Sequence, residues 1–501
     1  MMKQGCAART EVSVTMNADS HASYPDLRRT VRRALVLLNP GRVSRFYLAG
    51  LAAGAGQLGI DVRVLELGAI WSRPDAPRDR IARELLNVLE REKIDFVISY
   101  TFNGVFDLAV MKDATGRATS IFGHAGVPHL MLWTDHPQWA HERAALQRPA
   151  QAVLRQAHQH HFLKADYAAQ EVRRFLGWEN VYGLSVGEDP SLVHPIEGVA
   201  PEFDLVAVVG SPPYLPEEVA PFLDQPSPDT GQIFGVVAGK TARMLDEVWR
   251  TRADSLMQDK LAGLGRDWVE AKRRDPRRAA FYHYQHVAAD HPDAAAYLNE
   301  HYEIYFDALH AMWEFGRWQR AFVPLYLSRY FRVGVFGQDW SSVGLPGSAA
   351  WVNYDQQSAV YARGRVALNV NQCNDEEGLS HKAFQITASG VPCLHLDRPG
   401  VAEHFEPGCE IAAFTDPVDA REQAAALLGD EARRADVAQR GLMRFRRDHT
   451  WARRLEQMLS RMFGAASAPA TEAVVALRTT SSSGSTADLE RHDGDVVARI
   501  Q

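Results

Sequence analysis

The segment from Asn371 to Pro392 carries the residue types and spacing most able to do chemistry. It reads NQCNDEEGLSHKAFQITASGVP and begins where the apolar run RVALNVN ends, which predicts a buried strand before it. Ser380 is placed to cap a helix from about His381 to Ser389, with Gly390 as its left-handed stop. A helix that starts at a sheet edge presents free backbone N–H groups that bind anions. The segment therefore predicts an anion site.

Lys382 lies in the first turn of this predicted helix. A positive charge there opposes the helix dipole, so the position favours an anionic ligand beside the lysine. The alternative is an exposed lysine on the helix surface, which is the usual place for a solvated charge. The sequence leaves both interpretations open.

A second polar pair follows another predicted strand. Asp135 and His136 come directly after the apolar run HLMLW, at the carboxyl end of that strand. Either side chain could accept or orient the proton of an attacking hydroxyl, and histidine has the more suitable unperturbed pKa. The alternative is a capping aspartate and a packed histidine before Pro137. Gly41 and Arg42, and likewise Asn103 and Gly104, follow two further strands and could line an acceptor pocket.

Four patterns imitate known motifs in an unsuitable context. Residues 54–59 spell G-x-G-x-x-G, but these glycines end a helix and precede a strand. Residues 235–241 are one residue short of a phosphate-binding P-loop. The histidines at 158, 160 and 161 lack the spacing of helical zinc ligands, and a solvated or packed helix is the plainer interpretation. Residues 493–495 form Asp-Gly-Asp, which imitates a metal-binding Asp-x-Asp motif but lies in a small polar tail. Because none of the four patterns has the context that its chemistry requires, we expect no metal and no resident cofactor.

Strand-like and helix-like runs alternate on both sides of a long helical stretch. The strand-like runs are RALVLL, IDVRVLEL, DFVISYT, HLMLWTD and ENVYGLSV, then FDLVAVVG, RVGVFG, RVALNVN, PCLHL and EIAAF. This alternation predicts parallel sheets covered by helices on both faces. The expected fold class is α/β, with two Rossmann-like domains that face each other across a cleft where ligands bind.

The expected boundaries place an N-terminal Rossmann-like acceptor domain at residues 31–200. A donor domain comprises residues 201–214 and 331–463. Residues 215–330 interrupt the donor domain as a large helical insertion, rich in aromatic residues. Beyond helical character, the sequence assigns no role to this insertion.

Composition restricts the class of protein. The chain has 501 residues, of which 46% are apolar and 23% charged, as in an ordinary globular protein. The formal net charge of −7 gives no global attraction to nucleic acid. Residues 1–30 and 464–501 are expected to be disordered, and the N-terminal segment does not resemble a signal peptide. No apolar run is long enough for a transmembrane segment, so the expected location is cytoplasmic.

Residues 377–392 resemble the E-x7-E segment of two-domain (GT-B) glycosyltransferases. The closer likeness is to the spore-maturation-protein (CgeB-like) branch, which often has a basic residue two positions before a Phe-Glu pair. Lys382, Phe384 and Gln385 match that arrangement. Further likeness to the branch lies, in the expected order, at residues 133–137, 186–190, 398–403, 407–408 and 449–453. The resemblance covers most of the chain outside the insertion and the tails.

The resemblance implies roles for individual residues. Glu377 would accept hydrogen bonds from hydroxyls of the donor sugar, and the backbone of Gly378, Leu379 and Ser380 would approach the sugar or diphosphate. Lys382 and the helix N-terminus would offset the charge of the leaving nucleoside diphosphate, which a divalent metal does in another transferase architecture.

Other members of the implied donor-binding set are His381, Gln385, Gly400 and Glu403. Gln385 occupies the position of the second glutamate, which contacts the ribose hydroxyls. A glutamine lacks the charge and the two-oxygen acceptance of a carboxylate. The lysine-rich loop that often follows the first strand of the donor domain is also missing, because residues 210–213 read Gly-Ser-Pro-Pro.

These observations predict a metal-independent glycosyltransferase that moves a sugar from a nucleoside-diphosphate donor to a glycan, protein or lipid acceptor. Asp135, His136 and Glu377 are the expected catalytic residues. One alternative is a nucleotide-sugar epimerase of the same architecture. Another is a non-catalytic scaffold that binds a protein partner through the insertion. The sequence identifies neither the nucleotide, the sugar nor the acceptor, and the family tendency is towards retention of configuration.

Overall fold

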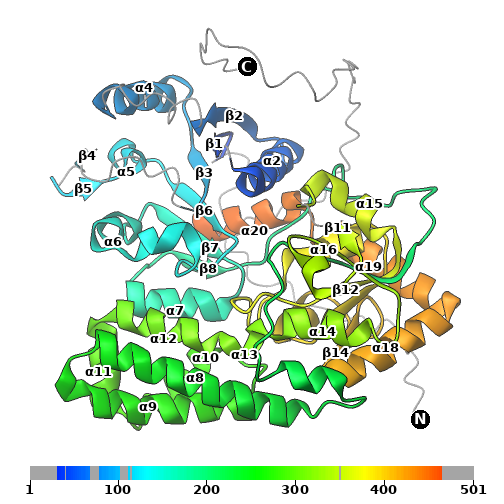
Figure 1. Cartoon of the computed structure of the whole chain (residues 1–501). Coiled ribbons are helices and arrows are strands. Elements are labelled where there is room, and N and C mark those ends of the chain that lie inside the picture. The colour runs from blue at the N-terminus through cyan, green and yellow to red at the C-terminus, as the bar shows by residue number, and fades with distance from the viewer. Residues whose placement is uncertain are drawn as a thin grey trace, which may run out of the picture.

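Six parallel strands form the first sheet, in the order β2-β1-β3-β6-β7-β8 (Figure 1). The computed structural model describes residues 31–39, 41–67, 78–101, 111–112, 116–348 and 351–464. The strands are Arg33–Leu38 (β1), Asp61–Glu66 (β2), Phe96–Tyr100 (β3), His129–Trp133 (β6), Gln159–Leu163 (β7) and Val181–Gly183 (β8). Every residue of β6 and β7 is buried, as expected for central strands covered on both faces.

The second sheet is also parallel and six-stranded, in the order β11-β10-β9-β12-β13-β14. Its strands are Phe203–Val208 (β9), Val333–Phe336 (β10), Gly347–Ser348 (β11), Gly364–Asn369 (β12), Cys393–Leu396 (β13) and Ala412–Phe414 (β14). β9 pairs with β10 and β12, although more than a hundred residues separate it from β10. Two parallel sheets with covering helices confirm the predicted α/β class. A short antiparallel pair, Met111–Lys112 (β4) and Ala118–Thr119 (β5), lies apart from both sheets.

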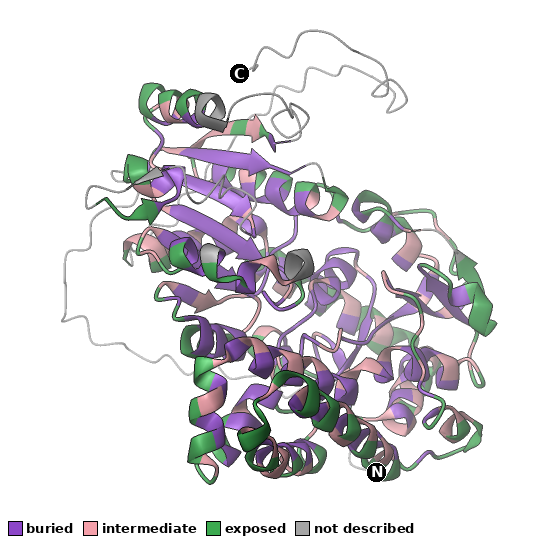
Figure 2. Ribbon diagram, turned by 60° about the vertical axis from the view of Figure 1, so that its left-hand side comes forward, coloured by how far each residue is buried: buried purple, intermediate pink, exposed green. Residues whose placement is uncertain are grey.

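Helices pack on both sheets, and the ribbon coloured by burial shows the strands enclosed between them (Figure 2). Those of the first sheet are Arg42–Gln57 (α2), Arg78–Arg91 (α4), Ile121–Ala125 (α5), Arg148–Leu154 (α6) and Asp166–Leu176 (α7). Those around the second sheet are Gln357–Tyr361 (α15), His381–Ala388 (α16), Pro399–His404 (α17), Pro417–Gly429 (α18) and Glu431–Asp448 (α19). The helix Trp451–Phe463 (α20) follows them.

Seven helices fill the stretch between β9 and β10. They are Thr230–Arg252 (α8), Ser255–Arg274 (α9), Ala280–Val287 (α10), Pro292–Glu300 (α11), Tyr302–Met312 (α12), Glu314–Arg317 (α13) and Gln319–Leu327 (α14). α10 packs against α7 of the first sheet, and α14 packs against α18 of the second (Figure 1). The insertion therefore contacts both halves of the molecule.

The last helix, α20, returns to pack on α2 of the first sheet. Gly50 and Gly54 of α2 permit this approach, because a Cβ on Gly50 would lie 2.3 Å from the Trp451 indole and one on Gly54 would lie 2.8 Å from Ala452 N. Gly59, with φ of +77°, then follows the end of α2. The glycines at 54–59 thus serve helix packing and termination, as their sequence context predicted.

The structure also tests the P-loop-like residues 235–241 and the histidine cluster. Residues 235–241 lie within α8, so they form no P-loop. The prediction of a helix over the histidine cluster is wrong, because His160 and His161 belong to β7. Both nitrogens of His161 are engaged, Nδ1 accepting from Trp133 Nε1 (3.2 Å) and Nε2 bonding to Leu154 O (2.8 Å). The segments 1–30 and 465–501, with the Asp-Gly-Asp at 493–495, lie outside the described residues.

Candidate functional site: two unpaired cations at the start of α16

The helix predicted from the sequence is present as α16. Ser380 caps it by accepting a hydrogen bond from Lys382 N (3.4 Å), and Gly390 follows it with φ of +68°. The helix begins after β12, on the side where the carboxyl ends of the strands in the second sheet lie. Its free N–H groups therefore face the edge at which parallel sheets bind ligands.

Lys382 is buried, with 9% of its surface exposed, so the interpretation as an exposed lysine is wrong. Its Nζ makes one long hydrogen bond, of 3.5 Å, to Gln357 Oε1. Burial and, to a smaller extent, the positive charge of Arg320 lower the pKa of Lys382 to about 7, against the opposing effect of Glu188. A buried ammonium without a carboxylate partner is unfavourable, which indicates that an anionic ligand completes the site.

Arg320, in α14 of the insertion, supplies the second positive charge. The residue is partly exposed, but its Nε is buried without a hydrogen-bond partner, and its guanidinium makes no ion pair with any residue that the structure describes. Burial lowers the pKa of Arg320, against the attraction of Cys373, Asp375 and Asp135. No local signal in the sequence marks Arg320, because only the folded insertion brings it to the sheet edge.

A cavity of about 70 Å³ lies between these two cations and the second sheet. Besides Arg320 and Lys382, its walls include the aromatic rings of Trp351, Tyr354 and His381. The His381 ring packs against Tyr354 and against Tyr47 of α2, with centroids 5.5 Å apart in each case. A space of this size suits a phosphate group beside the cations, and a nucleobase would extend beyond it.

Three consecutive carboxylates precede α16, and they bind groups of the first sheet and of the insertion. Asp375 forms an ion pair with Lys164 after β7 (2.5 Å), and Glu376 forms one with Lys272 of α9 (2.6 Å). Glu377 Oε1 accepts a hydrogen bond from Ala279 N at the start of α10 (2.6 Å). This acidic loop, residues 375–377, therefore ties the first sheet and the insertion to the start of α16.

Glu377 itself is half-buried, and burial raises the pKa of its carboxyl group. Gly378, Leu379 and Ser380 follow Glu377 directly in the chain, and all three are buried. Gly400 N donates to Glu377 O (2.8 Å), and a Cβ on Gly400 would lie 2.7 Å from the same oxygen. Gly400 thus supports the backbone of this loop, whereas Glu403 lies further along α17 with an exposed side chain.

Gln385 is fully buried one turn after Lys382 and lies beside Glu188 of the segment that joins the two sheets. Burial raises the pKa of Glu188 to about 8, and the hydrogen bond from Asp189 N opposes the shift. Neither amide atom of Gln385 has a hydrogen-bond partner among the described residues, and Glu188 Oε2 has none either. A buried amide without partners is unfavourable, so Gln385 keeps its donor and acceptor available for a ligand.

On the first sheet, Asp135 and His136 have different surroundings. His136 Nε2 lies 2.9 Å from Glu171 Oε2, and its Nδ1 accepts from Gln138 N (3.1 Å). The His136 ring also packs against Phe306 and Trp313 of the insertion. These contacts fix the ring between Glu171 and the insertion. Asp135 is partly exposed, and its charge acts on Arg320, Tyr100 and Tyr354.

A second cavity, of about 450 Å³, lies between the two sheets. Gly41 and Arg42 line it from the first sheet, and Gln338 and Trp351 line it from the second. Trp351 also borders the cavity beside Lys382, so the two spaces adjoin. The other expected acceptor-side pair, Asn103 and Gly104, lies outside the described residues.

The described part of the chain contains no group of three or more His, Cys, Asp or Glu side chains arranged to hold a metal ion. Within the same residues, no helix is both long and apolar enough to cross a membrane.

One family model matches part of the chain. Residues 317–460, which include Arg320 and α16, match a family model described as "Glycosyl transferase-like", so this part carries a glycosyltransferase-like domain. A comparison with curated proteins gave no match.

Solved structures with partial likeness include sucrose-phosphate synthase from Thermosynechococcus elongatus. Its identity is 11% and its TM-score 0.41, over 87% of this chain and 100% of that one. Anabaena HepE in complex with UDP-glucose has 10% identity and a TM-score of 0.42, over 85% and 98%. A glycosyltransferase from Rickettsia africae has 8% identity and a TM-score of 0.39, over 86% and 98%.

Proposed function

We propose that this chain is a glycosyltransferase that takes its sugar from a nucleoside-diphosphate donor. The observation that carries the proposal is the pair of Lys382, which is buried, and Arg320, which is partly buried, at the N-terminus of α16; neither forms an ion pair with a described residue. A diphosphate between them would neutralise both charges and accept hydrogen bonds from the free N–H groups of the helix. Arg320 thereby takes the place of the lysine-rich loop that the sequence lacks.

The nucleoside is proposed to lie against Trp351, which borders both the cavity beside Lys382 and the larger cavity next to it. UDP-glucose, bound by Anabaena HepE, makes a uridine nucleotide the first donor to test. The spore-maturation-protein branch remains the proposed subfamily, on the strength of the sequence motifs. We propose that no metal is required, because two fixed cations and a helix N-terminus can stabilise the leaving diphosphate.

In the proposed reaction, an acceptor hydroxyl oxygen bonds to the anomeric carbon of the donor sugar. The bond from that carbon to the diphosphate breaks, and the nucleoside diphosphate leaves with the electron pair. The hydroxyl proton goes to a base, for which Asp135 is the candidate, since His136 already uses both ring nitrogens. Glu377 is proposed to orient the sugar through the carboxylate oxygen that Ala279 does not use.

Thermal unfolding with a panel of nucleotides and nucleotide sugars, in the presence of EDTA, tests the donor site. At 100 times the dissociation constant, a ligand of the folded state adds about 2.7 kcal/mol of stability. We expect a shift with one nucleotide family in the wild-type protein and no shift in Lys382→Ala or Arg320→Ala. Arg329→Ala, which removes an exposed arginine just after α14, should shift as the wild type does. The absence of any shift in the wild type would contradict the donor site.

A nucleotide-sugar epimerase remains the second candidate, because the cavity beside Lys382 would suit the same donor. The two activities differ in their products. An epimerase converts a nucleotide sugar into its epimer without an acceptor, whereas a transferase releases free nucleoside diphosphate. Chromatography of the nucleotide products after incubation with the donor that binds distinguishes them.

A further inference from the structure

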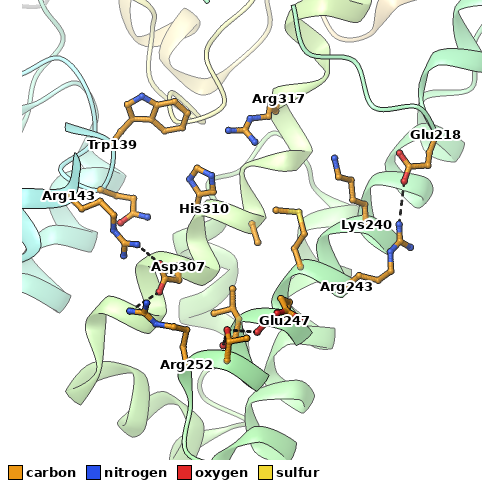
Figure 3. Close-up of a pocket in the computed structure, with 15 residues that line it drawn as sticks. Trp139, Arg143, Glu218, Lys240, Arg243, Glu247, Arg252, Asp307, His310 and Arg317 are labelled. Carbon is orange, nitrogen blue, oxygen red and sulfur yellow. Dashed lines mark hydrogen bonds and ion pairs between the residues drawn. The ribbon is translucent and has the colours of Figure 1, made fainter. Parts of the chain in front are cut away.

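A cavity of about 960 Å³ lies between the helical insertion and the segment that follows β6 (Figure 3). Trp139 and Arg143, which follow β6, form one side, and Lys240, Arg243 and Arg252 of α8 form another. Ligand pockets have volumes of about 300 to 1,000 Å³, so this cavity has room for more than one sugar ring. Neither the family match, which begins at residue 317, nor the donor site explains it.

This insertion cavity lies near the proposed donor site. A smaller cavity of about 350 Å³ shares Trp139 and Arg317 with it. The smaller cavity also shares Arg320 and Gln372 with the space beside Lys382. The three cavities are therefore neighbours, in a row that runs from Lys382 and Arg320, past Trp139, to the insertion.

Positive charge predominates in the wall of the insertion cavity. Its five cationic side chains outnumber its carboxylates, which are Glu218, Glu247 and Asp307. Arg143 and Arg252 (3.3 Å) both bind Asp307, so one carboxylate serves two guanidinium groups (Figure 3). Arg243 reaches Glu218 only at 3.5 Å. Because each guanidinium has five N–H donors, several remain available for an anionic ligand.

An aromatic surface lies where the insertion cavity meets the smaller one. Trp139 keeps 43% of its surface exposed, although large aromatic side chains are usually buried. Its ring stacks on His310 of α12, with centroids 5.7 Å apart and planes 30° apart, and it also contacts Trp313. A rigid, half-exposed indole offers a flat apolar face, to which the C–H face of a pyranose ring is complementary.

We propose that this row of cavities binds the acceptor, and that the acceptor is an acidic oligosaccharide, whose carboxylate or phosphate groups bind the arginines while a sugar ring stacks on Trp139. The proposal rests on the proposed glycosyltransferase function. It follows from the adjacency of the cavities, because an acceptor hydroxyl must reach the donor sugar beside Asp135 and Arg320. The remaining units of a longer acceptor then extend along the row to the insertion.

Calorimetric titration of the full chain with tetragalacturonate, at low ionic strength, tests this proposal. Neutral maltotetraose and inorganic tripolyphosphate serve as comparison ligands. We expect tetragalacturonate to bind and maltotetraose to bind at least about tenfold more weakly, because only the former can form charge-assisted hydrogen bonds. Added salt should weaken the binding of tetragalacturonate. Tripolyphosphate, titrated with the donor site saturated by the nucleotide that binds, should bind more weakly than tetragalacturonate, since it cannot stack on Trp139.

Variants locate the binding. Trp139→Ala and Arg243→Ala should each weaken tetragalacturonate binding by about tenfold. Arg250→Ala is the matched control, because Arg250 is in the same helix, α8, and is equally exposed (69% against 68% for Arg243), but does not line the cavity. Both arginines make only surface ion pairs, so their removal should leave the fold intact.

Three results would overturn the proposal. They are equal binding of the acidic and neutral tetrasaccharides, tripolyphosphate binding as tight as that of tetragalacturonate, or no binding of tetragalacturonate. The nucleotide-induced thermal shift, measured on the same samples, separates this failure from that of the proposed function. If the nucleotide shift persists without tetragalacturonate binding, only the acceptor proposal fails, and if both are absent, the donor site fails as well.

Discussion

Lys272 Nζ lies 2.6 Å from Glu376 Oε1 in a buried ion pair that joins α9 of the insertion to the acidic loop before α16. The side chains are 3% and 6% exposed. Glu376 also accepts from Ala280 N at the start of α10 (3.0 Å), and Lys272 donates to Arg278 O. The insertion is therefore attached to the loop that leads into the proposed donor site.

Removing one partner of this pair should destabilise the protein strongly. Glu376→Leu leaves the Lys272 ammonium buried without its carboxylate, which costs about 3–5 kcal/mol. The double variant Glu376→Leu with Lys272→Met should recover most of that loss, because neither charge then remains buried. Denaturant unfolding of the single and double variants measures both effects. A single variant as stable as the wild type would show that the pair does not hold the insertion.

Lys382→Met should stabilise the unliganded protein and remove nucleotide binding. In the folded protein the lowered pKa of Lys382 means that the charged form is disfavoured. Replacing an uncompensated buried cation by an apolar side chain of similar length should therefore add about 1–4 kcal/mol. The folded state has the lower pKa, so the gain is full below pH 7 and diminishes between pH 7 and the unfolded value of 10.5.

Thermal unfolding at pH 6.5, with and without the nucleotide that binds, measures both parts of this prediction. Lys260→Met is a suitable control, since Lys260 forms an exposed pair with Asp293 on α9 and α11. That change should alter stability by less than about 1 kcal/mol. A variant that loses stability in the unliganded state would contradict the view that Lys382 is retained for a ligand.

The sequence revealed the local features and missed the long-range ones. Helix α16 was predictable because Ser380 and Gly390, which begin and end it, act on adjacent backbone groups. Strand β7 was missed because its residues, QHHFL, are not typical of a buried strand, and its histidines are accommodated by tertiary contacts such as that between His161 and Trp133. Arg320 reaches Lys382 only through the folded insertion, and no spacing in the sequence encodes that contact.

Gly50→Leu should loosen the attachment of α20 to α2. A Cβ at this position would lie 2.3 Å from the Trp451 indole, so any larger side chain must displace that buried ring. Overpacking of this kind costs about 1–3 kcal/mol. Gly56→Ala in the same helix is the control, because a Cβ there meets no atom within 4 Å. Alanine should stabilise this helical position by about 0.5–1 kcal/mol. Denaturant unfolding should therefore show a lower free energy of unfolding for Gly50→Leu than for the wild type, and a higher one for Gly56→Ala.

Nucleotide affinity should fall as the pH rises through about 7. The pKa of Lys382 in the unliganded protein is about 7, since burial and Arg320 both disfavour its charged form. A diphosphate binds the protonated amine, so the fraction of protein competent to bind falls about tenfold between pH 6 and pH 8. Calorimetric titration across this range, in buffers of different ionisation enthalpy, should also detect proton uptake on binding. Lys382→Arg keeps its charge throughout, so this variant should bind with little dependence on pH, and a wild-type affinity that stays constant from pH 6 to pH 8 would exclude Lys382 as the group that neutralises the diphosphate.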